Sequence, residues 1–541
     1  MMSAISLNIG SLLAFIICGI GNILFRSTLA NNVYKNGEKV ILYVNKVGPY
    51  SNPQETYHYY HLPVCRPLEV VHKKLSLAEL MNGDRMAESI YNISFRVDTP
   101  KTALCNKFQY KASELISMLR AIEANYYFEF IIDNIILRNF LGNVEEISIF
   151  PHKHKVFLFT HHHFIFEYNN EEIVHAKILI DRERPHRIDN AFENNLPVDV
   201  TFTYSVEWKE SKVRRSQADI VHDSFFPKSF EIHWLSVINS SLLVFLLLAF
   251  VVLIMIRIIR SDLSKYNFGN EKEANDFDDH GWKVIHGDVF RSPKYLNMLC
   301  AILGVGVQLL TITATILLIV LFSLIDEHTH GLINVAALVL YALTSGIAGY
   351  VSSSMYKKLG GERWIFNINL TFGLFSVPTF MVWSIENSIS WAYKSTQALP
   401  YQTVVLLLAL WTLIGYPLTV VGGVLGKNFP HGFCDVKNDV AAYRVRQIPR
   451  ELPSALGFYH SPLAYGFVGG FLSFRSTGFF VLTYALFFYC QRSQMSGFFQ
   501  TSQFFGYVFL VCYGFFISLG TVSFFASWKF VQYIYSNIKT E

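Results

Sequence analysis

The sequence contains few charged residues. Asp, Glu, Lys and Arg make up 16% of its 541 residues, whereas soluble domains carry roughly 25%. Hydrophobic residues make up 52% and aromatic residues 16%, which is the composition of a membrane protein. The formal net charge is only +4, so the sequence predicts no nucleic-acid partner.

The sequence also lacks the common enzyme motifs: it has no HExxH, no GxSxG and no Walker loop. The stretch GWKVIHGDVFRSP (Gly281–Pro293) does carry a His-x-Asp pair, His286 and Asp288. No nucleophile or metal ligand accompanies the pair, so we interpret the stretch as a turn anchored at the membrane surface by Trp282 and Phe290. We therefore predict that the protein is not an enzyme, has no catalytic residues and needs no cofactor.

The long apolar runs contain almost no ionisable residues. Glu386 lies at the end of one run, and the polar residues Gln308, Asn239 and Asn369 are uncharged. Ion-coupled transporters usually need carboxylates or cations within the membrane. The scarcity of such residues counts against an ion-coupled pump, but it does not exclude a passive channel.

Hydrophobicity divides the chain into segments. An apolar run near the N-terminus ends before Thr28 and Ala30, which occupy the −3 and −1 positions of a cleavage site ahead of Asn31. The chain is then mixed and polar up to about Ile232, and mostly apolar beyond it. We predict a signal peptide at 1–30, a luminal domain at 31–229, a polytopic transmembrane domain at 230–528 and a cytosolic tail at 529–541.

A membrane-spanning helix needs roughly 20 apolar residues. About seven intervals qualify: 233–256, 297–325, 331–355, 364–385, 401–425, 470–490 and 502–527. The sixth is the weakest because Arg475 lies inside it. Lys and Arg concentrate in the first, third and fifth connectors, at 257–296, 356–363 and 426–462. The positive-inside rule therefore predicts that these connectors and the C-terminus are cytosolic and that the 31–229 domain is luminal.

The luminal domain has the pattern of a β-rich fold. Six segments are rich in β-branched and aromatic residues, several with period-2 alternation: 91–97, 125–132, 156–160, 164–168, 172–180 and 200–208. Ser76 and Glu79 have capping-box spacing at the start of a short helix that Gly83 would end. We expect a sandwich-like β domain followed by an α-helical bundle.

The luminal domain contains two cysteines and one exposed glycosylation sequon. Cys65 and Cys105 are a candidate disulfide in an oxidising lumen, and two free buried thiols are the alternative. Asn92 begins an Asn-Ile-Ser triplet and is the candidate glycosylation site.

His161 and His163 would share one face of a strand, a spacing that can bind Zn or Cu. No Cys or carboxylate cluster joins them, so a polar strand edge is the favoured interpretation and we predict no metal site.

Small residues recur at four-residue spacing within the predicted spans. Ser345, Gly349 and Ser353 form one stripe, and Gly422 and Gly426 form another. Such stripes let helix backbones approach closely. They serve either internal packing, the favoured interpretation, or a groove that accepts a helix of a cargo protein.

Several long motifs resemble the transmembrane 9 superfamily, the nonaspanins. They include VNKVGPYSNPQETYHYYHLPVC (44–65), NNLPVDVTFTYSVEW (194–208), EIHWLSVINS (231–240), GWKVIHGDVFRSP, YALTSGIAGY (341–350), GGVLGKN (422–428) and QMSGFFQTSQFFGY (494–507). The resemblance runs from about Asn31 to the C-terminus. It implies a luminal N-terminal domain, nine spans and residence in Golgi and endosomal membranes.

The resemblance also implies a function. Family members are implicated in sorting membrane proteins, notably cargo with glycine-rich spans. Their C-terminal Lys-x-Asp/Glu signal, which the COPI coat reads, matches Lys539 and Glu541. After residues 446–453 this chain joins almost directly to the penultimate family span, so two of the nine spans are expected to be missing.

Two other functions stay open. Gln308, Thr311 and Thr315 on one helix could line the path of a channel, transporter or lipid scramblase. Alternatively, His161 and His163 could handle a metal in the lumen.

Overall fold

The computed structural model forms two compact units. The first comprises Met1–Asp223, Tyr295–Phe433 and Tyr465–Ser523, and the second comprises Ser224–Lys294, Cys434–Ala464 and Phe524–Glu541. The structure describes residues 33–105, 108–148, 153–180, 186–188, 198–212, 225, 234–268, 289–322, 331–429, 476–495 and 497–537.

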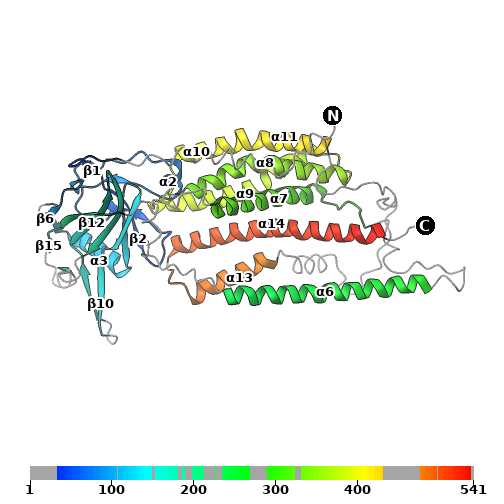
Figure 1. The fold of residues 1–541 in the computed structure, drawn as a ribbon, viewed down its shortest axis with the longest axis horizontal. Helices are drawn as coiled ribbons and strands as arrows, with labels where there is room; N and C mark the ends of the chain where they lie inside the picture. Colours follow the sequence, from blue (N-terminus) through cyan, green and yellow to red (C-terminus); the bar gives the residue numbers. More distant parts are fainter. Residues whose placement is uncertain are drawn as a thin grey trace. The chain divides into compact units, whose positions relative to one another are not determined.

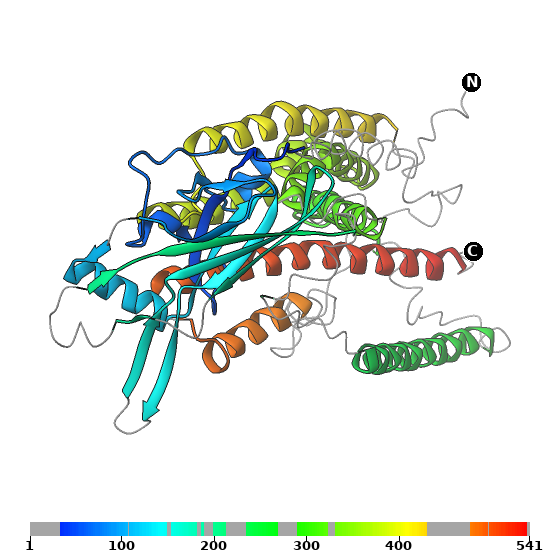
Figure 2. The same cartoon turned by 60° about the vertical axis from the view of Figure 1, so that its left-hand side comes forward.

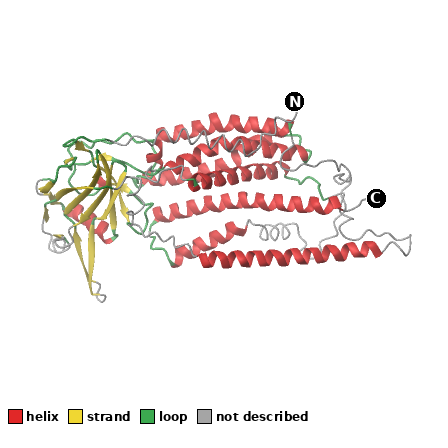
Figure 3. Cartoon of the chain, in the orientation of Figure 1, coloured by secondary structure: helices red, strands yellow, loops and turns green. Residues whose placement is uncertain are grey.

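The N-terminal part of the first unit is built from strands (Figure 3). They are β1 Lys39–Val40, β2 Tyr43–Pro49, β3 Tyr57–His58, β4 Ala87–Glu88, β5 Ile93–Ser94, β6 Thr99–Ala103, β7 Phe108–Tyr110, β8 Tyr126–Ile132, β9 Ile135–Phe140, β10 Gly142–Ser148, β11 Lys153–Leu158, β12 His161–Asn169, β13 Glu172–Ile180, β14 His186–Arg187, β15 Val198–Val200 and β16 Thr203–Glu210. The larger sheets have the orders β3-β2-β8-β9, with β4 also on β2, and β13-β12-β16-β6. β12 pairs antiparallel with β13 and parallel with β16.

Aromatic side chains fill the core between these sheets. Phe128 and Phe130 of β8 and Phe164 and Phe166 of β12 are each 0% exposed. Along β12 the buried residues alternate with half-buried ones, as a strand with one face on the core requires. The expected β-rich domain is therefore confirmed, and its core comes from the segments whose alternation predicted strands.

Two helices and one helical turn accompany the strands: η1 Tyr59–His61, α2 Leu77–Met81 and α3 Ala112–Glu123. The predicted capping box at α2 is confirmed, because the Ser76 side chain accepts from the Glu79 N–H and the Glu79 carboxylate accepts from the Ser76 N–H. Gly83 follows the helix with a φ of +72°, the left-handed conformation that ends helices.

The remaining helices are long and apolar (Figure 1). They are α6 Trp234–Phe268, α7 Leu296–Leu321, α8 Leu332–Lys358, α9 Trp364–Ala392, α10 Tyr401–Leu410, α11 Tyr416–Asn428, α13 Ser476–Gln491 and α14 Phe498–Asn537, with the π-helical turn η4 Trp411–Gly415 joining α10 to α11. Among the described residues, six helical segments are long and apolar enough to cross a membrane. The fold class, a β-rich domain followed by a bundle of apolar helices, is thus confirmed.

The predicted intervals can be compared with these helices. Those at 233–256, 297–325, 331–355, 364–385, 401–425 and 502–527 coincide with the six segments within several residues at each end. The interval 470–490 contains the shorter helix α13, whose described part begins at Ser476. That all seven intervals cross a membrane stays a prediction.

Within the first unit, α8 packs against α7, α9 and α11 (Figure 2). The helices approach each other through glycine. A Cβ atom on Gly422 would lie 1.9 Å from the backbone oxygen of Gly346, and one on Gly304 would lie 2.5 Å from that of Ala348. Glycine at these positions allows two helix backbones to touch, as membrane helices commonly do.

Candidate functional site at the domain junction

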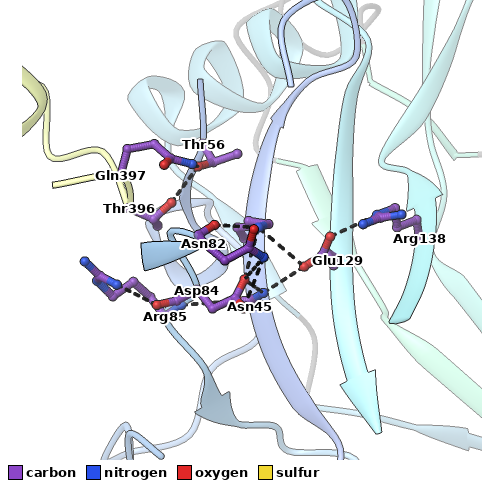
Figure 4. A network of polar contacts seen from close by, with 10 residues as sticks. Asn45, Thr56, Asn82, Asp84, Arg85, Glu129, Arg138, Thr396 and Gln397 are labelled. Atoms are coloured by element: carbon purple, nitrogen blue, oxygen red, sulfur yellow. Dashed lines mark hydrogen bonds and ion pairs between the residues drawn. The ribbon is translucent and has the colours of Figure 1, made fainter. Parts of the chain in front are cut away.

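The β-rich domain is joined to the helices of the first unit by polar contacts around Thr56 (Figure 4). Thr56 is 0% exposed, and its partners lie in the connector between α9 and α10. The Thr56 hydroxyl lies 2.6 Å from that of Thr396, and the Gln397 amide donates to it at 3.2 Å. The Thr56 carbonyl accepts from Ser395 Oγ and from the Thr396 N–H, both at 2.9 Å. All the polar groups of this residue are therefore used at the junction, apart from its own N–H.

Arg85 makes a second link to the same connector. Its guanidinium donates to the Ala398 carbonyl and to the Asp84 carbonyl, each at 2.6 Å. Its backbone N–H donates to Asn45 Oδ1 at 2.8 Å. Arg85 thus connects the bundle side of the junction to the interior of the β-rich domain.

That interior holds a buried cluster of charged residues. Lys46 Nζ lies 3.0 Å from Asp84 Oδ1 and 3.8 Å from Glu129 Oε1, and Arg138 Nε lies 2.9 Å from Glu129 Oε2. The Asn45 amide donates to Asp84 at 2.9 Å and to Glu129 at 2.8 Å. Asn45 and Asp84 are 0% exposed and Glu129 is 1% exposed. Opposite charges and hydrogen bonds are what such buried ions need to be tolerated.

The electrostatics of the cluster favour its charged form. Burial by itself lowers the pKa of the Lys46 ammonium, but attraction to Glu129 and Asp84 outweighs burial and leaves that pKa raised. Burial lowers the pKa of Arg85, and Asp84 opposes this effect. The cations of the cluster therefore depend on their carboxylate partners.

A local irregularity of β2 lies at the cluster. The pairing of β2 with β8 shifts register between Val44 and Val47, so Asn45 and Lys46 are the two residues at a β-bulge. Bulges redirect side chains that simple alternation would place on opposite faces. Both residues are buried, as is the rest of β2 from Val44 to Pro49.

Two further contacts hold the domain against the ends of helices. Gly331, the N-cap of α8, lies so close to α2 that a Cβ atom on it would be 2.0 Å from the Ala78 carbonyl oxygen. The Gln500 amide of α14 donates to the carboxylate of Glu55, which also accepts from Tyr57 Oη at 2.7 Å. The domain therefore meets α8, the α9–α10 connector and α14.

Histidines lie beside the junction. His58 pairs with Lys46 in the register of β3 and β2, and its ring centroid lies 5.4 Å from that of His72 and 6.5 Å from that of His61. Burial, with smaller effects of His72 and His61, lowers the pKa of His58 to about 4. Its ring is consequently neutral at neutral pH.

The junction offers hydrogen-bonding groups and paired charges, an arrangement suited to holding the two parts in a fixed relation. Among the described residues, no group of three or more His, Cys, Asp or Glu is placed to hold a metal ion. Sequence reasoning did not single out Thr56, Asp84, Arg85 or residues 395–398. A signal was present, since Asn45 and Lys46 interrupt an apolar strand inside the motif at 44–65.

The structure places the residues predicted for the luminal domain as follows. Cys65 and Cys105 form a disulfide, with Cα atoms 6.2 Å apart. Asn92 is exposed, as an acceptor for a glycan must be. Glycosylation itself stays a prediction.

The two candidate metal histidines are engaged by neighbouring side chains on β16. His161 Nδ1 lies 2.9 Å from Thr203 Oγ1, and His163 Nδ1 lies 2.8 Å from Ser205 Oγ. His163 Nε2 lies 3.3 Å from a Glu207 carboxylate oxygen. The strand residue between them, His162, points into the core and is 8% exposed.

The two small-residue stripes meet each other. A Cβ atom on Gly349 would lie 2.1 Å from the Thr419 carbonyl, and one on Gly426 would lie 2.3 Å from the Tyr350 carbonyl. Ser345 Oγ donates to the Gly415 carbonyl at 3.0 Å, and Ser353 and Gly422 are also buried. In this structure the stripes pack α8 against α11 of the same chain.

Other predicted features lie outside the described residues: the signal peptide at 1–30, Trp282, His286, Asp288, Arg475, and the tail residues Lys539 and Glu541. Phe290, the other predicted interfacial anchor, is described, and its ring lies 5.4 Å from that of Trp528 within the second unit.

A family model described as Endomembrane protein 70 matches residues 56–476. The chain is 44% identical over 580 residues to a Bos taurus protein named Transmembrane 9 superfamily member 1, with 94% of each chain covered. It is 36% identical over 595 residues to Transmembrane 9 superfamily member 3 of Arabidopsis thaliana, with 98% of each covered. No solved structure matches.

A third relative, from Dictyostelium discoideum, is called a phagocytic receptor. It is 35% identical over 467 residues, covering 86% of this chain and 77% of that protein. The 580-residue alignment with the bovine protein is longer than this 541-residue chain. The alignment therefore contains gaps in this chain, which agrees with an internal deletion relative to the family.

Proposed function

The chain belongs to the transmembrane 9 superfamily and is a multi-pass membrane protein, and from this premise we propose that it sorts and localises other membrane proteins in Golgi and endosomal membranes. The observation that carries the proposal is family membership over 94% of the chain. We assign it no enzymatic activity.

The junction supports a role in recognition close to the bilayer. A domain hinged on a long linker would sample many positions above the membrane. Here Thr56 and Arg85 hold the domain to the α9–α10 connector, beside helices apolar enough to cross the membrane. In the proposed topology this domain is luminal, so cargo would meet it next to the membrane.

We propose that the cargo consists of membrane proteins with glycine-rich spans. The stripes at Ser345, Gly349, Ser353, Gly422 and Gly426 pack α8 against α11. A cargo span would therefore contact other helix faces of the chain, where apolar side chains are exposed. The bilayer is the other partner that these faces require.

We propose that the tail sets the itinerary of the protein. Lys539 and Glu541 have the spacing of a Lys-x-Glu signal for the COPI coat, and such signals are addresses read by a receptor. The tail functions in this way only if the C-terminus is cytosolic.

A localisation assay in cells that lack the chain tests the proposal. The reporter is a membrane protein with a glycine-rich span, and its matched control has leucine in place of those glycines. The full chain should restore the surface level of the first reporter and leave the second unchanged. Lys539→Ala with Glu541→Ala should redistribute the chain out of the Golgi, whereas Thr540→Ala should not. Equal effects on both reporters would contradict the sorting role.

A further inference from the structure

Glu386 of α9 is half-buried and carries a carboxylate that faces α14 in the first unit. It lies six residues before the end of α9, or about 9 Å along the helix axis. Its Oε1 accepts a hydrogen bond from Ser502 Oγ of α14 at 2.8 Å. A carboxylate between apolar helices is stabilised when a positive charge lies beside it.

α14 approaches this carboxylate closely. A Cβ atom on Gly506 would lie 2.7 Å from Glu386 Oε1 and 3.0 Å from Cδ, so any larger residue would displace the carboxylate. Two aromatic contacts hold the same helix pair on either side. The rings of Tyr393 and Phe499 stack at 5.1 Å, and those of Phe375 and Tyr513 stack at 5.6 Å.

One side-chain oxygen atom on each of the two facing helices has no hydrogen-bond donor among the described residues. They are Glu386 Oε2 and Gln503 Oε1, and both are buried. Gln503 is only 5% exposed. It lies three residues before Gly506 and four after Phe499, so it shares the side of α14 that packs on α9 and the connector after it.

Buried polar atoms in folded proteins usually have partners, so these two acceptors can take a ligand that the described residues do not supply. A neutral donor could supply hydrogen bonds to these oxygen atoms, but it would leave the negative charge of Glu386 unbalanced. A cation would satisfy both requirements.

We propose that Glu386, Ser502 and Gln503 form a site for a single monovalent metal cation between α9 and α14, for which Na⁺ is the probe. The ligands would be the carboxylate, the hydroxyl oxygen and the amide oxygen, a set of hard oxygen donors suited to hard cations. One carboxylate balances one positive charge, whereas Ca²⁺ sites usually gather several carboxylates. The bound ion would join α9 to α14 and thereby stabilise the bundle. The site concerns binding and implies no transport.

Thermal unfolding of the purified full chain in lipid nanodiscs tests the site. Sodium chloride is titrated against choline chloride at constant ionic strength and neutral pH, with KCl and CaCl₂ as separate arms. Because a ligand of the folded state stabilises it by mass action, the melting temperature should rise with Na⁺ and then saturate. Glu386→Gln should abolish the response, and Glu362→Gln, at an exposed carboxylate between α8 and α9, should retain it.

A milder variant covers the case in which Glu386→Gln does not fold. Ser502→Ala keeps the carboxylate and removes one ligand, so about tenfold more Na⁺ should be needed for half of the response. Direct binding of radioactive sodium to the same samples provides the second readout.

Several outcomes would overturn the proposal. One is a melting temperature that does not respond to Na⁺, or that responds equally in the Glu386→Gln variant. Another is a response to Ca²⁺ alone. A third is a melting temperature that follows pH and not Na⁺ and loses this dependence in Glu386→Gln, since the carboxylate would then be neutralised by a proton.

Discussion

The β-rich domain and the helix bundle of the first unit have different interiors. The domain buries large aromatic side chains together with a cluster of ions around Asp84 and Glu129. The bundle buries glycine, serine and threonine at its α8–α11 contact, and it leaves many large apolar side chains exposed. The difference follows from the solvent, because water drives apolar groups inward, whereas lipid provides no such force between helices and rewards close backbone packing.

The two interiors also satisfy polar groups in different ways. In the domain, charged side chains pair with one another. In the bundle, hydroxyl groups return to backbone carbonyls, as when Thr344 Oγ1 donates to the Leu340 carbonyl at 2.7 Å. The most damaging substitution should therefore differ between the two regions.

Removal of the buried cation should have the largest effect. Lys46→Met would leave Asp84 with Asn45 but without its ion pair, at a cost to folding of about 3–5 kcal/mol. The purified full chain should consequently show a much lower melting temperature in detergent. Lys177→Met, at an exposed position on β13, is the matched control. An equal melting temperature for the two variants would show that the cluster is not what stabilises the domain.

In the bundle the corresponding substitution is the addition of one methyl group. Gly422→Ala places a Cβ atom 1.9 Å from the Gly346 backbone oxygen, so α8 and α11 must separate, at a cost of about 3 kcal/mol. Gly514→Ala is the matched control, since a Cβ atom there meets nothing within 4 Å. Melting temperatures of the two variants measure the difference. Similar values would mean that α8 and α11 do not pack as closely as the structure shows.

Sequence reasoning was more successful with the kinds of structure than with their contacts. Alternation in segments such as 164–168 predicted strands, and the spacing of Ser76 and Glu79 predicted a capping box, because both patterns reflect local geometry. The junction could not be predicted in this way. Thr56 and Thr396 are 340 residues apart, and no local pattern joins them.

The buried charges were missed for a related reason. Periodicity places neighbouring strand residues on opposite faces, but β2 is buried from Val44 to Pro49, so both Asn45 and Lys46 lie in the interior. Conversely, the small-residue stripes at Ser345 and Gly422 were visible in the sequence. Their partner was not, because a stripe specifies close approach without naming the helix that approaches.

The comparison can be sharpened with pH, which should act on the domain. His162 lies in the aromatic core, its Nδ1 2.7 Å from Tyr91 Oη, and burial lowers its pKa to about 4. In the unfolded state this histidine binds a proton near pH 6.5. Its contribution to the free energy of unfolding is therefore fully present above that pH and is lost as the pH falls towards 4. We expect a loss of about 2 kcal/mol between about pH 7.5 and pH 5 from this residue.

His162→Asn keeps a hydrogen-bonding group for Tyr91 and removes the titration. The variant should therefore show a weaker dependence of melting temperature on pH over that interval than the parent chain. His186→Asn, at an exposed histidine on β14, is the control and should leave the dependence unchanged. An unaltered pH profile in His162→Asn would assign the acid sensitivity to other groups, such as His58.

The smallest effect is expected at a single carbonyl in the bundle. Pro378 lies inside α9 and has no N–H to donate to the Leu374 carbonyl one turn earlier. Tyr513 Oη of α14 donates to this carbonyl at 2.6 Å. Tyr513→Phe should therefore destabilise the chain by about 1 kcal/mol, whereas Tyr484→Phe, at an exposed tyrosine on α13, should not.

A double-mutant cycle isolates the cause. In Pro378→Ala, residue 378 regains an N–H that can donate to the Leu374 carbonyl within α9. That carbonyl then has a donor even without the Tyr513 hydroxyl. The cost of Tyr513→Phe should then shrink in the Pro378→Ala background. If the cost is the same in both backgrounds, the tyrosine stabilises the α9–α14 contact through its ring, which stacks on Phe375. In that case the bundle would depend on aromatic packing, as the domain does, and the contrast between the two interiors would be weaker than their polar contacts indicate.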